Sequence, residues 1–270
     1  MSTKLSACLI VKNEETFLEA CLSSIKDLVD EIVVVDTGST DSTVKIAERF
    51  GAKIGSFVWC DDFSAARNYS IEMASGDWVL WIDADETIPS SSHNAIREAL
   101  TQSDHAAYDI SIVNQLGDGD VFVHCGTRLF RKLPGVQFEG RIHEQISPSI
   151  RKLGKSIGVL SGATIEHAGY RPEIVVERGK TERTIKMLEE EVRENPDNSF
   201  QWFNLANAYS IAARFEEATL AARKSLKTAT SEDSHTSTTY QLLADCQDRM
   251  GCGEVALETI SDAKKAGHWT

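Results

Sequence analysis

Short apolar runs alternate with helix-like segments over the first ninety residues, and this alternation limits the folds that the chain can adopt. The runs that we expect to form strands are Leu5–Val11, Glu31–Val35, Lys53–Val58 and Trp78–Ile82. Between them, apolar spacing and capping residues predict helices over residues 16–25, from Asp41 and Ser42 through Phe50, and from Ser64 through Ala74. Strands separated by helices are typical of βαβ units, so the sequence predicts an α/β domain with a mainly parallel sheet.

The pattern changes after Ala106. Residues 108–113, 121–124, 127–130 and 159–165 are β-like, and Gly117-Asp118-Gly119 is expected to form a turn. We expect these segments to complete the sheet and to form a second layer beside it, in an order that the sequence does not reveal. Beyond Pro172 the sequence becomes helical, so we place the α/β domain at residues 1–172 and a helical region at residues 173–270.

The helical region contains an internal repeat. Its first copy contains Trp202, Leu205, Ala206, Tyr209 and Ala218, and its weaker second copy contains Tyr240, Leu243, Ala244 and Ala256. The interval from the aromatic residue to the last alanine is sixteen residues in both copies, which matches a tetratricopeptide repeat. The copies are thirty-eight residues apart instead of the usual period of about 34, and residues 231–234 belong to the insertion. The alternative is an ordinary helical hairpin. Two repeats alone need a cap or a partner, such as a second copy of the chain.

The composition excludes several classes of protein. With a formal net charge of -13, the chain as a whole repels polyanions, so we expect no nucleic-acid partner and no attraction to anionic lipid. No apolar stretch is long enough to cross a bilayer, and the first residues carry no signal-peptide pattern. The six cysteines form neither a CxxC pair nor a dense framework, which favours free thiols in a reducing, cytoplasmic protein.

Acidic side chains follow the predicted strand Trp78–Ile82 at its carboxyl end. Asp83 and Asp85 lie where the ligand sites of open α/β sheets are found. Their carboxylates are suitable ligands for Mg²⁺ or Mn²⁺, to which a phosphorylated substrate would add further oxygens. Alternatively, the acids begin a helix, since carboxylates are favoured in a first helical turn.

Asp36 and Arg67 are further candidates near the strand ends. Asp36 follows an apolar run and could accept hydrogen bonds from a nucleobase or a sugar, or cap the next helix. Arg67 lies near the start of a predicted helix, where its planar guanidinium could bind a diphosphate or pair with an acid. Gly38 allows a tight turn in which the backbone approaches a ligand.

Three motifs resemble those of family 2 glycosyltransferases with the GT-A fold: residues 9–15 (LIVKNEE), residues 35–41 (VDTGSTD) and Asp83-Ala84-Asp85. The run from Asp62 to Asn68 (DFSAARN) and the helical tail are similar to bacterial members that carry tetratricopeptide repeats. The resemblance implies a metal-dependent enzyme that transfers a sugar, with inversion, from a nucleotide-diphosphate donor. A UDP-sugar is the expected donor.

The resemblance also implies roles for single residues. Asp85 would bind Mn²⁺ or Mg²⁺, Asp83 would bind the metal or the donor ribose, and a late histidine, His167, would complete the metal shell. Glu14 and Asp36 would contact the base of the nucleotide. A neutral imidazole suits Mn²⁺ better than Mg²⁺, so His167 favours manganese.

A catalytic base should lie across the anomeric carbon from the diphosphate, and therefore in the later half of the α/β domain. The segment from Phe138 to Glu144 (FEGRIHE) resembles the site motif in this part of related transferases. We assign the base to Glu144, with His143 orienting it or contacting the acceptor. Alternatively, Glu144 pairs with Arg141 or Arg151 at the surface.

The acceptor does not follow from the sequence. Helix pairs offer grooves for peptides, which favours a peptide or protein acceptor over a saccharide. One alternative is a glycosyltransferase of the lipopolysaccharide-core type, which has a lipid-linked saccharide as its acceptor. Another is a scaffold that binds nucleotide sugars without catalysis and acts through its repeats, although the intact Asp83, Asp85 and Glu144 argue against it.

Overall fold

A computed structural model describes residues 3–101, 104–115, 121–168, 178–231 and 233–268. The chain divides into a sheet unit, residues 1–139 with 144–176, and a helical unit, residues 140–143 with 177–270. The sequence predicts a boundary after residue 172 and assigns residues 140–143 to the first domain. Within the described residues, no helix is long and apolar enough to cross a membrane.

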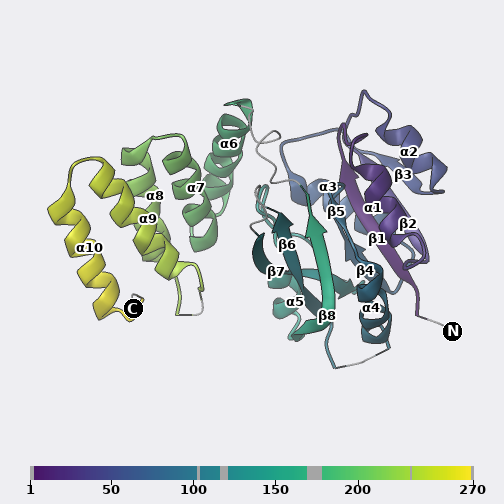
Figure 1. Ribbon diagram of the computed structural model, residues 1–270. Coiled ribbons are helices and arrows are strands. Elements are labelled where there is room, and N and C mark those ends of the chain that lie inside the picture. Colours follow the sequence, from purple (N-terminus) through teal and green to yellow (C-terminus); the bar gives the residue numbers. More distant parts are fainter. Residues whose placement is uncertain (1–2, 102–103, 116–120, 169–177, 232, 269–270) are drawn as a thin grey trace. The chain divides into compact units, whose positions relative to one another are not determined.

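The sheet unit contains one eight-stranded mixed sheet in the order β3-β2-β1-β4-β7-β6-β8-β5 (Figure 1). Its strands are β1 (Leu5–Val11), β2 (Glu31–Asp36), β3 (Lys53–Ser56), β4 (Trp78–Trp81), β5 (Glu86–Thr87), β6 (Ala107–Gln115), β7 (Val121–Arg131) and β8 (Ile157–His167). Strands β1 to β4 are parallel, as the βαβ pattern predicts. Strand β7 runs antiparallel to both β4 and β6, and β6 is parallel to β8. The carboxyl ends of β1, β2, β3, β4, β6 and β8 therefore lie along one edge of the sheet.

The second half of the sheet differs from the prediction in two ways. Its strands all join the single sheet and form no second layer, and residues 121–131 form one strand where two are predicted. The predicted break lay at Cys125-Gly126, but Gly126 continues the ladder opposite Ile110, and a Cβ there would lie 3.4 Å from the Ile112 side chain. The predicted turn at residues 117–119 lies outside the described residues.

Helices cover both faces of the sheet. On one face lie α1 (Leu18–Ile25), α2 (Thr43–Arg49) and α4 (His93–Ala99), and on the other lie α3 (Phe63–Met73) and α5 (Ser147–Lys152). Because successive side chains of a strand point to opposite faces, Ala7 and Leu9 of β1 pack with the first set and Cys8 with the second. The short elements without a predicted counterpart include β5, α5 and the 3-10 turn η1 (Ser90–Ser92) before α4.

The predicted cap of α3 at Ser64 is wrong. The N-cap is Asp62, whose carboxylate accepts a hydrogen bond from the backbone N–H of Ala65 at 2.9 Å. Ser64 lies inside the first turn and is buried. Asp62 prevails because it precedes the helix in an extended conformation, with its carboxylate in reach of the first free N–H groups.

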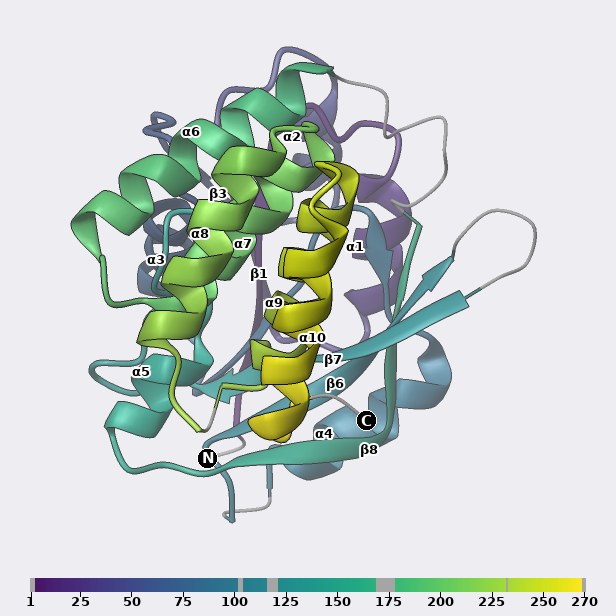
Figure 2. The same cartoon turned by 90° about the vertical axis from the view of Figure 1, so that its left-hand side faces the viewer.

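The helical unit consists of α6 (Arg178–Glu194) followed by two hairpins, α7 (Ser199–Ile211) with α8 (Phe215–Thr228) and α9 (Thr236–Arg249) with α10 (Gly253–Lys265). Helices that follow one another in the chain pack side by side, as Figures 1 and 2 show. The core of this unit contains the small and apolar repeat positions Leu205, Ala206, Ala218 and Leu243. The two hairpins fall where the two repeat copies predict them.

Candidate active site

The loops that follow β1 and β2 are hydrogen-bonded to each other at the carboxyl edge of the sheet. Asn13 adopts a left-handed backbone conformation with φ of 56°, and its Oδ1 accepts a hydrogen bond from the N–H of Thr40 at 2.7 Å. The N–H of Asn13 donates to Oγ of Ser39 at 2.9 Å. The carboxylate of Glu15 accepts from the N–H of Ser42 at 2.9 Å. The two predicted nucleotide-binding loops therefore form one preorganised surface.

The side chain of Asp36 is hydrogen-bonded to the backbone of the loop that follows it. Its carboxylate accepts hydrogen bonds from the N–H groups of Gly38 and Ser39 at 3.1 Å each, while Ser42 occupies the N-cap position of α2. The backbone φ of Gly38 is 108°, a value that favours glycine, and nothing lies within 4 Å of a Cβ built there. Glu14 lies beside this loop, half-buried, and its N–H donates to Oγ1 of Thr43.

Arg67 of α3 joins two predicted site carboxylates. Its Nη2 lies 2.8 Å from Oδ1 of Asp83, and its Nε donates a short hydrogen bond to Oε1 of Glu144. Arg67 is buried, and only 10% of the Glu144 side chain is exposed. The alternative for Glu144, a surface pair with Arg141 or Arg151, differs from the structure, in which Glu144 forms a shielded ion pair with Arg67 next to Asp83.

A second buried arginine supports this group from β7. Arg128 makes two hydrogen bonds to the carboxylate of Glu86, at 2.9 and 2.7 Å, and Glu86 is only 2% exposed. Trp81 of β4 packs against both arginines, with the Arg67 and Arg128 guanidinium carbons 4.2 and 3.6 Å from its ring centroid. Trp81, Glu86 and Arg128 are not among the site residues expected from the sequence, although an arginine beside the apolar pair Leu129-Phe130 is a signal of a paired buried charge.

The charges of this group reinforce one another. Burial favours the neutral form of Asp83, but the charges of Arg67 and Arg128 outweigh it and hold the pKa of Asp83 below its usual value. Burial also opposes ionisation of Arg67, yet the carboxylates of Asp83 and Glu144 raise the pKa of Arg67. For Glu86 burial prevails and raises its pKa, against the attraction of Arg128. Arg67 is therefore a permanent cation between two acids.

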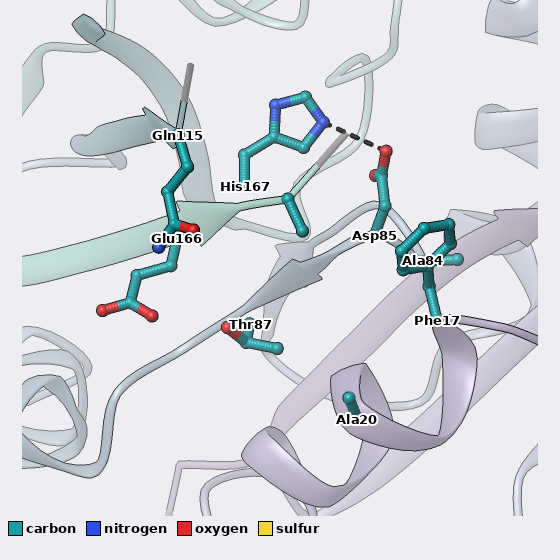
Figure 3. A pocket seen from close by; sticks show the side chains of 9 residues that line it. Phe17, Ala20, Ala84, Asp85, Thr87, Gln115, Glu166 and His167 are labelled. Atoms are coloured by element: carbon teal, nitrogen blue, oxygen red, sulfur yellow. Dashed lines mark hydrogen bonds and ion pairs between the residues drawn. The ribbon is translucent and has the colours of Figure 1, made fainter. Parts of the chain in front are cut away.

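Asp85 and His167 form a separate pair, which Figure 3 shows. Nε2 of His167 lies 3.1 Å from Oδ2 of Asp85, and Nδ1 lies 2.8 Å from Oδ1 of Asn114. The hydrogen bond to Asp85, aided by the charges of nearby carboxylates, raises the pKa of His167, although burial acts the other way. The pair borders a cavity of about 100 Å³ that is also lined by Phe17, Ala20, Ala84, Thr87, Gln115, Glu166 and Ala168.

The donor atoms of Asp85 and His167 fit a divalent cation. Two ligands at about 2.1 Å from an octahedral ion and at right angles lie about 3 Å apart, which is close to the observed 3.1 Å. In the described part of the chain, no three His, Cys, Asp or Glu side chains are grouped to hold a metal. The three predicted metal ligands thus divide, because Asp83 faces the arginines while Asp85 faces His167.

His143 belongs to the helical unit by its contacts, although it precedes Glu144 in the chain. It is exposed and has a positive backbone φ of 53°.

All six cysteines are free thiols, and Cys8, Cys21 and Cys246 are buried. Burial raises the pKa of Cys8 to about 12, so this thiol stays protonated at neutral pH.

Known proteins resemble this chain over more than half of its length. The model of the family "Glycosyl transferase family 2" matches residues 6–160, more than half of the chain. A TPR repeat-containing protein of Synechococcus elongatus is 36% identical over 202 residues, which are 73% of this chain and 50% of that protein. The SPbeta prophage-derived glycosyltransferase SunS of Bacillus subtilis is 30% identical over 221 residues, which are 81% of this chain and 52% of SunS.

A solved structure shares the fold. The crystal structure of residues 1–349 of S. aureus TarS in complex with UDP-GlcNAc has a TM-score of 0.59 and 16% identity, over 98% of this chain and 92% of that one. The present chain spans about half the length of the two curated relatives. Its sheet order, its strand-end carboxylates and the matching family model lead to one conclusion: the chain belongs to glycosyltransferase family 2 and has the GT-A fold.

Proposed function

We propose that this chain transfers a sugar, with inversion at the anomeric carbon, from a nucleotide-diphosphate sugar to a nucleophilic acceptor. The observation that carries the proposal is the placement of Asp85 with His167 and of Arg67 with Asp83 and Glu144 at the strand ends of a family 2 sheet. Ligands of α/β sheets bind at such an edge. A UDP-sugar is the first donor to test, and UDP-GlcNAc is a suitable probe because it was bound to TarS, a protein of the same fold.

On the donor side of the site, a divalent cation would bind the diphosphate. Oδ2 of Asp85 and Nε2 of His167 would hold Mn²⁺ or Mg²⁺, with manganese favoured by the imidazole ligand. When bound, the cation would neutralise charge on the departing diphosphate. Asp83, held ionised by Arg67, would face the donor ribose. Glu14 and Asp36 would contact the nucleobase from the hydrogen-bonded loops that follow β1 and β2.

On the acceptor side of the site, Glu144 would be the general base. Its carboxylate would take the acceptor proton as the acceptor atom bonds to the anomeric carbon and the bond to the diphosphate breaks. Arg67 would fix the orientation of Glu144 through the ion pair, and thereby link the base to the donor-binding Asp83. His143 would contact the acceptor. A single displacement of this kind inverts the anomeric configuration.

We further propose a peptide, protein or saccharide as the acceptor. Helix pairs can offer grooves for peptides, so the hairpins α7–α8 and α9–α10 are candidates for acceptor binding, and the same surfaces would suit a second copy of the chain. In this proposal the sheet unit carries the donor site, and the helical unit carries acceptor recognition or self-association.

Thermal stabilisation by UDP-GlcNAc and other UDP-sugars, with and without Mn²⁺, tests the donor assignment. We expect one UDP-sugar to raise the melting temperature only when Mn²⁺ is present, because a ligand that binds the folded state stabilises it. Saturable UDP binding without donor hydrolysis would favour the scaffold alternative, whereas absence of saturable UDP binding would contradict the proposed enzyme.

A further inference from the structure

Asn114 lies on β6, the strand between β7 and β8, beside the Asp85–His167 pair. In the register of the sheet, it stands opposite Phe122 of β7 on one side and His167 of β8 on the other. The residue is 1% exposed, so its amide must find its partners within the protein. Its Nδ2 donates to the carbonyl oxygen of Phe122 at 2.9 Å and lies 3.0 Å from Nδ1 of His124, while Oδ1 lies 2.8 Å from Nδ1 of His167.

These contacts permit one orientation of the amide. The carbonyl oxygen of Phe122 can only accept a hydrogen bond, so the NH₂ group of Asn114 must face it. Oδ1 must then face His167, and because Oδ1 can only accept, Nδ1 of His167 carries a proton. In a neutral imidazole this leaves the lone pair on Nε2, which is the nitrogen 3.1 Å from Oδ2 of Asp85.

We propose that Asn114 is a positioning residue that holds His167 in the tautomer and ring orientation needed to bind a divalent cation through Nε2. The backbone carbonyl of Phe122 and the ring of His124 fix Asn114 in turn, so the orientation is transmitted across three strands. Metal-ligating histidines commonly donate their other N–H to such a partner, which sets the ring and its tautomer. The inference rests on the proposed role of His167 as a metal ligand.

The matched variants are N114L, H167A and T127V. N114L places an apolar side chain of similar size at position 114 and removes the hydrogen-bond acceptor for His167. T127V is the control, because Thr127 makes another side-chain hydrogen bond between β6 and β7, to Asp109, away from the Asp85–His167 pair. Mn²⁺ is titrated into the full chain at saturating UDP, and free Mn²⁺ is measured by electron paramagnetic resonance. Far-UV circular dichroism checks that each variant is folded.

We expect N114L to raise the Kd for Mn²⁺ by about 10- to 100-fold, as loss of an outer-sphere partner does in other metal sites. T127V should bind Mn²⁺ as the wild type does. In the H167A background, N114L should cause no further loss, because there is no imidazole left to position. N114D retains an acceptor for Nδ1 of His167, so its Kd should lie between those of the wild type and N114L, which also provides a test if N114L does not fold.

The outcomes separate this inference from the proposed function. If H167A weakens Mn²⁺ binding but N114L and N114D bind as the wild type does, His167 remains the ligand and the positioning role of Asn114 is wrong. An equal loss from N114L in the wild-type and H167A backgrounds would also overturn it, since the effect would then not pass through His167. If H167A itself binds Mn²⁺ normally, the proposed ligand assignment fails, and the inference fails with it.

Discussion

At the scale of single residues, two arginines organise the acids at the strand ends. Arg67 connects Asp83 with Glu144, which lie 61 residues apart in the chain, and Arg128 forms an ion pair with Glu86. Both guanidinium groups pack on Trp81, which shields them from water. A buried charge costs free energy unless it is paired, so each acid and each arginine depends on its partner.

The assignment of the base to Glu144 predicts a kinetic effect without a binding effect. In E144Q, the side chain keeps an oxygen that can accept from Nε of Arg67, but it cannot take a proton from the acceptor. We expect kcat to fall by about 10²- to 10⁴-fold while the Kd for UDP stays within about twofold. Steady-state turnover with calorimetric titration of UDP measures both quantities. Near-normal turnover in E144Q would remove Glu144 from the role of base.

The Arg128–Glu86 pair predicts a loss of stability instead. E86Q removes the carboxylate charge that makes two hydrogen bonds to the buried Arg128 and leaves Arg128 with the more distant carboxylate of Asp83, at 3.9 Å. The free energy of unfolding of the sheet unit should therefore fall by about 3 kcal/mol in urea titrations. The control is E139Q, which breaks the exposed pair with Lys152 and should change the free energy by less than about 1 kcal/mol. Equal effects of the two substitutions would mean that burial of the pair does not set its contribution.

At the scale of elements, the sequence predicts both the strands and the arrangement of the first half of the sheet, but only the positions of the strands in the second half. The strands β1, β2 and β4 are buried on both faces, so each is a continuous apolar run that needs no tertiary information to find. Strands β6, β7 and β8 are partly exposed, and their order depends on pairing between distant segments. Local patterns locate such strands without revealing their neighbours.

The same limit applies to the candidate site. Strand-end position indicated Asp36 and Asp83, which follow apolar runs directly, and Asp85, which lies two residues after Asp83. The contact between Arg67 and Glu144 spans 77 residues, and that between Asn114 and His167 spans 53. Neither pair has a local signature, since each is created by the register of the sheet or by packing of α3 beside it.

The cap of α3 gives a prediction at this scale. Asp62 satisfies a free N–H group at the start of the helix that carries Arg67. D62A should lower the free energy of unfolding by about 1 kcal/mol, whereas D62N, which can also accept the hydrogen bond, should remain near the wild-type value. Thermal melts of both variants provide the comparison. A loss of equal size in D62N would show that the charge of Asp62, and not its capping bond, is what stabilises α3.

At the scale of the whole molecule, each unit has a hydrophobic core of its own. The sheet unit has one core on each face of the sheet, which include Leu9 and Ile82 on one face and Val79 and Phe130 on the other. The core of the helical unit contains only residues of that unit, among them Leu188, Leu205 and Ala222. Because separate cores can unfold in separate cooperative steps, a single free energy of unfolding need not describe this chain.

Differential scanning calorimetry of the full chain tests this division. We expect two unfolding transitions, and we expect UDP with Mn²⁺ to raise the temperature of only one, because the proposed donor residues all lie in the sheet unit. At a ligand concentration of about 100 times Kd, the stabilisation of that transition should be about 2.7 kcal/mol. L205A, which opens a cavity in the helical core, should lower only the other transition. A single transition that both the ligands and L205A shift as a whole would show that the two units unfold as one, and the proposed division into a donor-binding and a helical domain would then lose its thermodynamic basis.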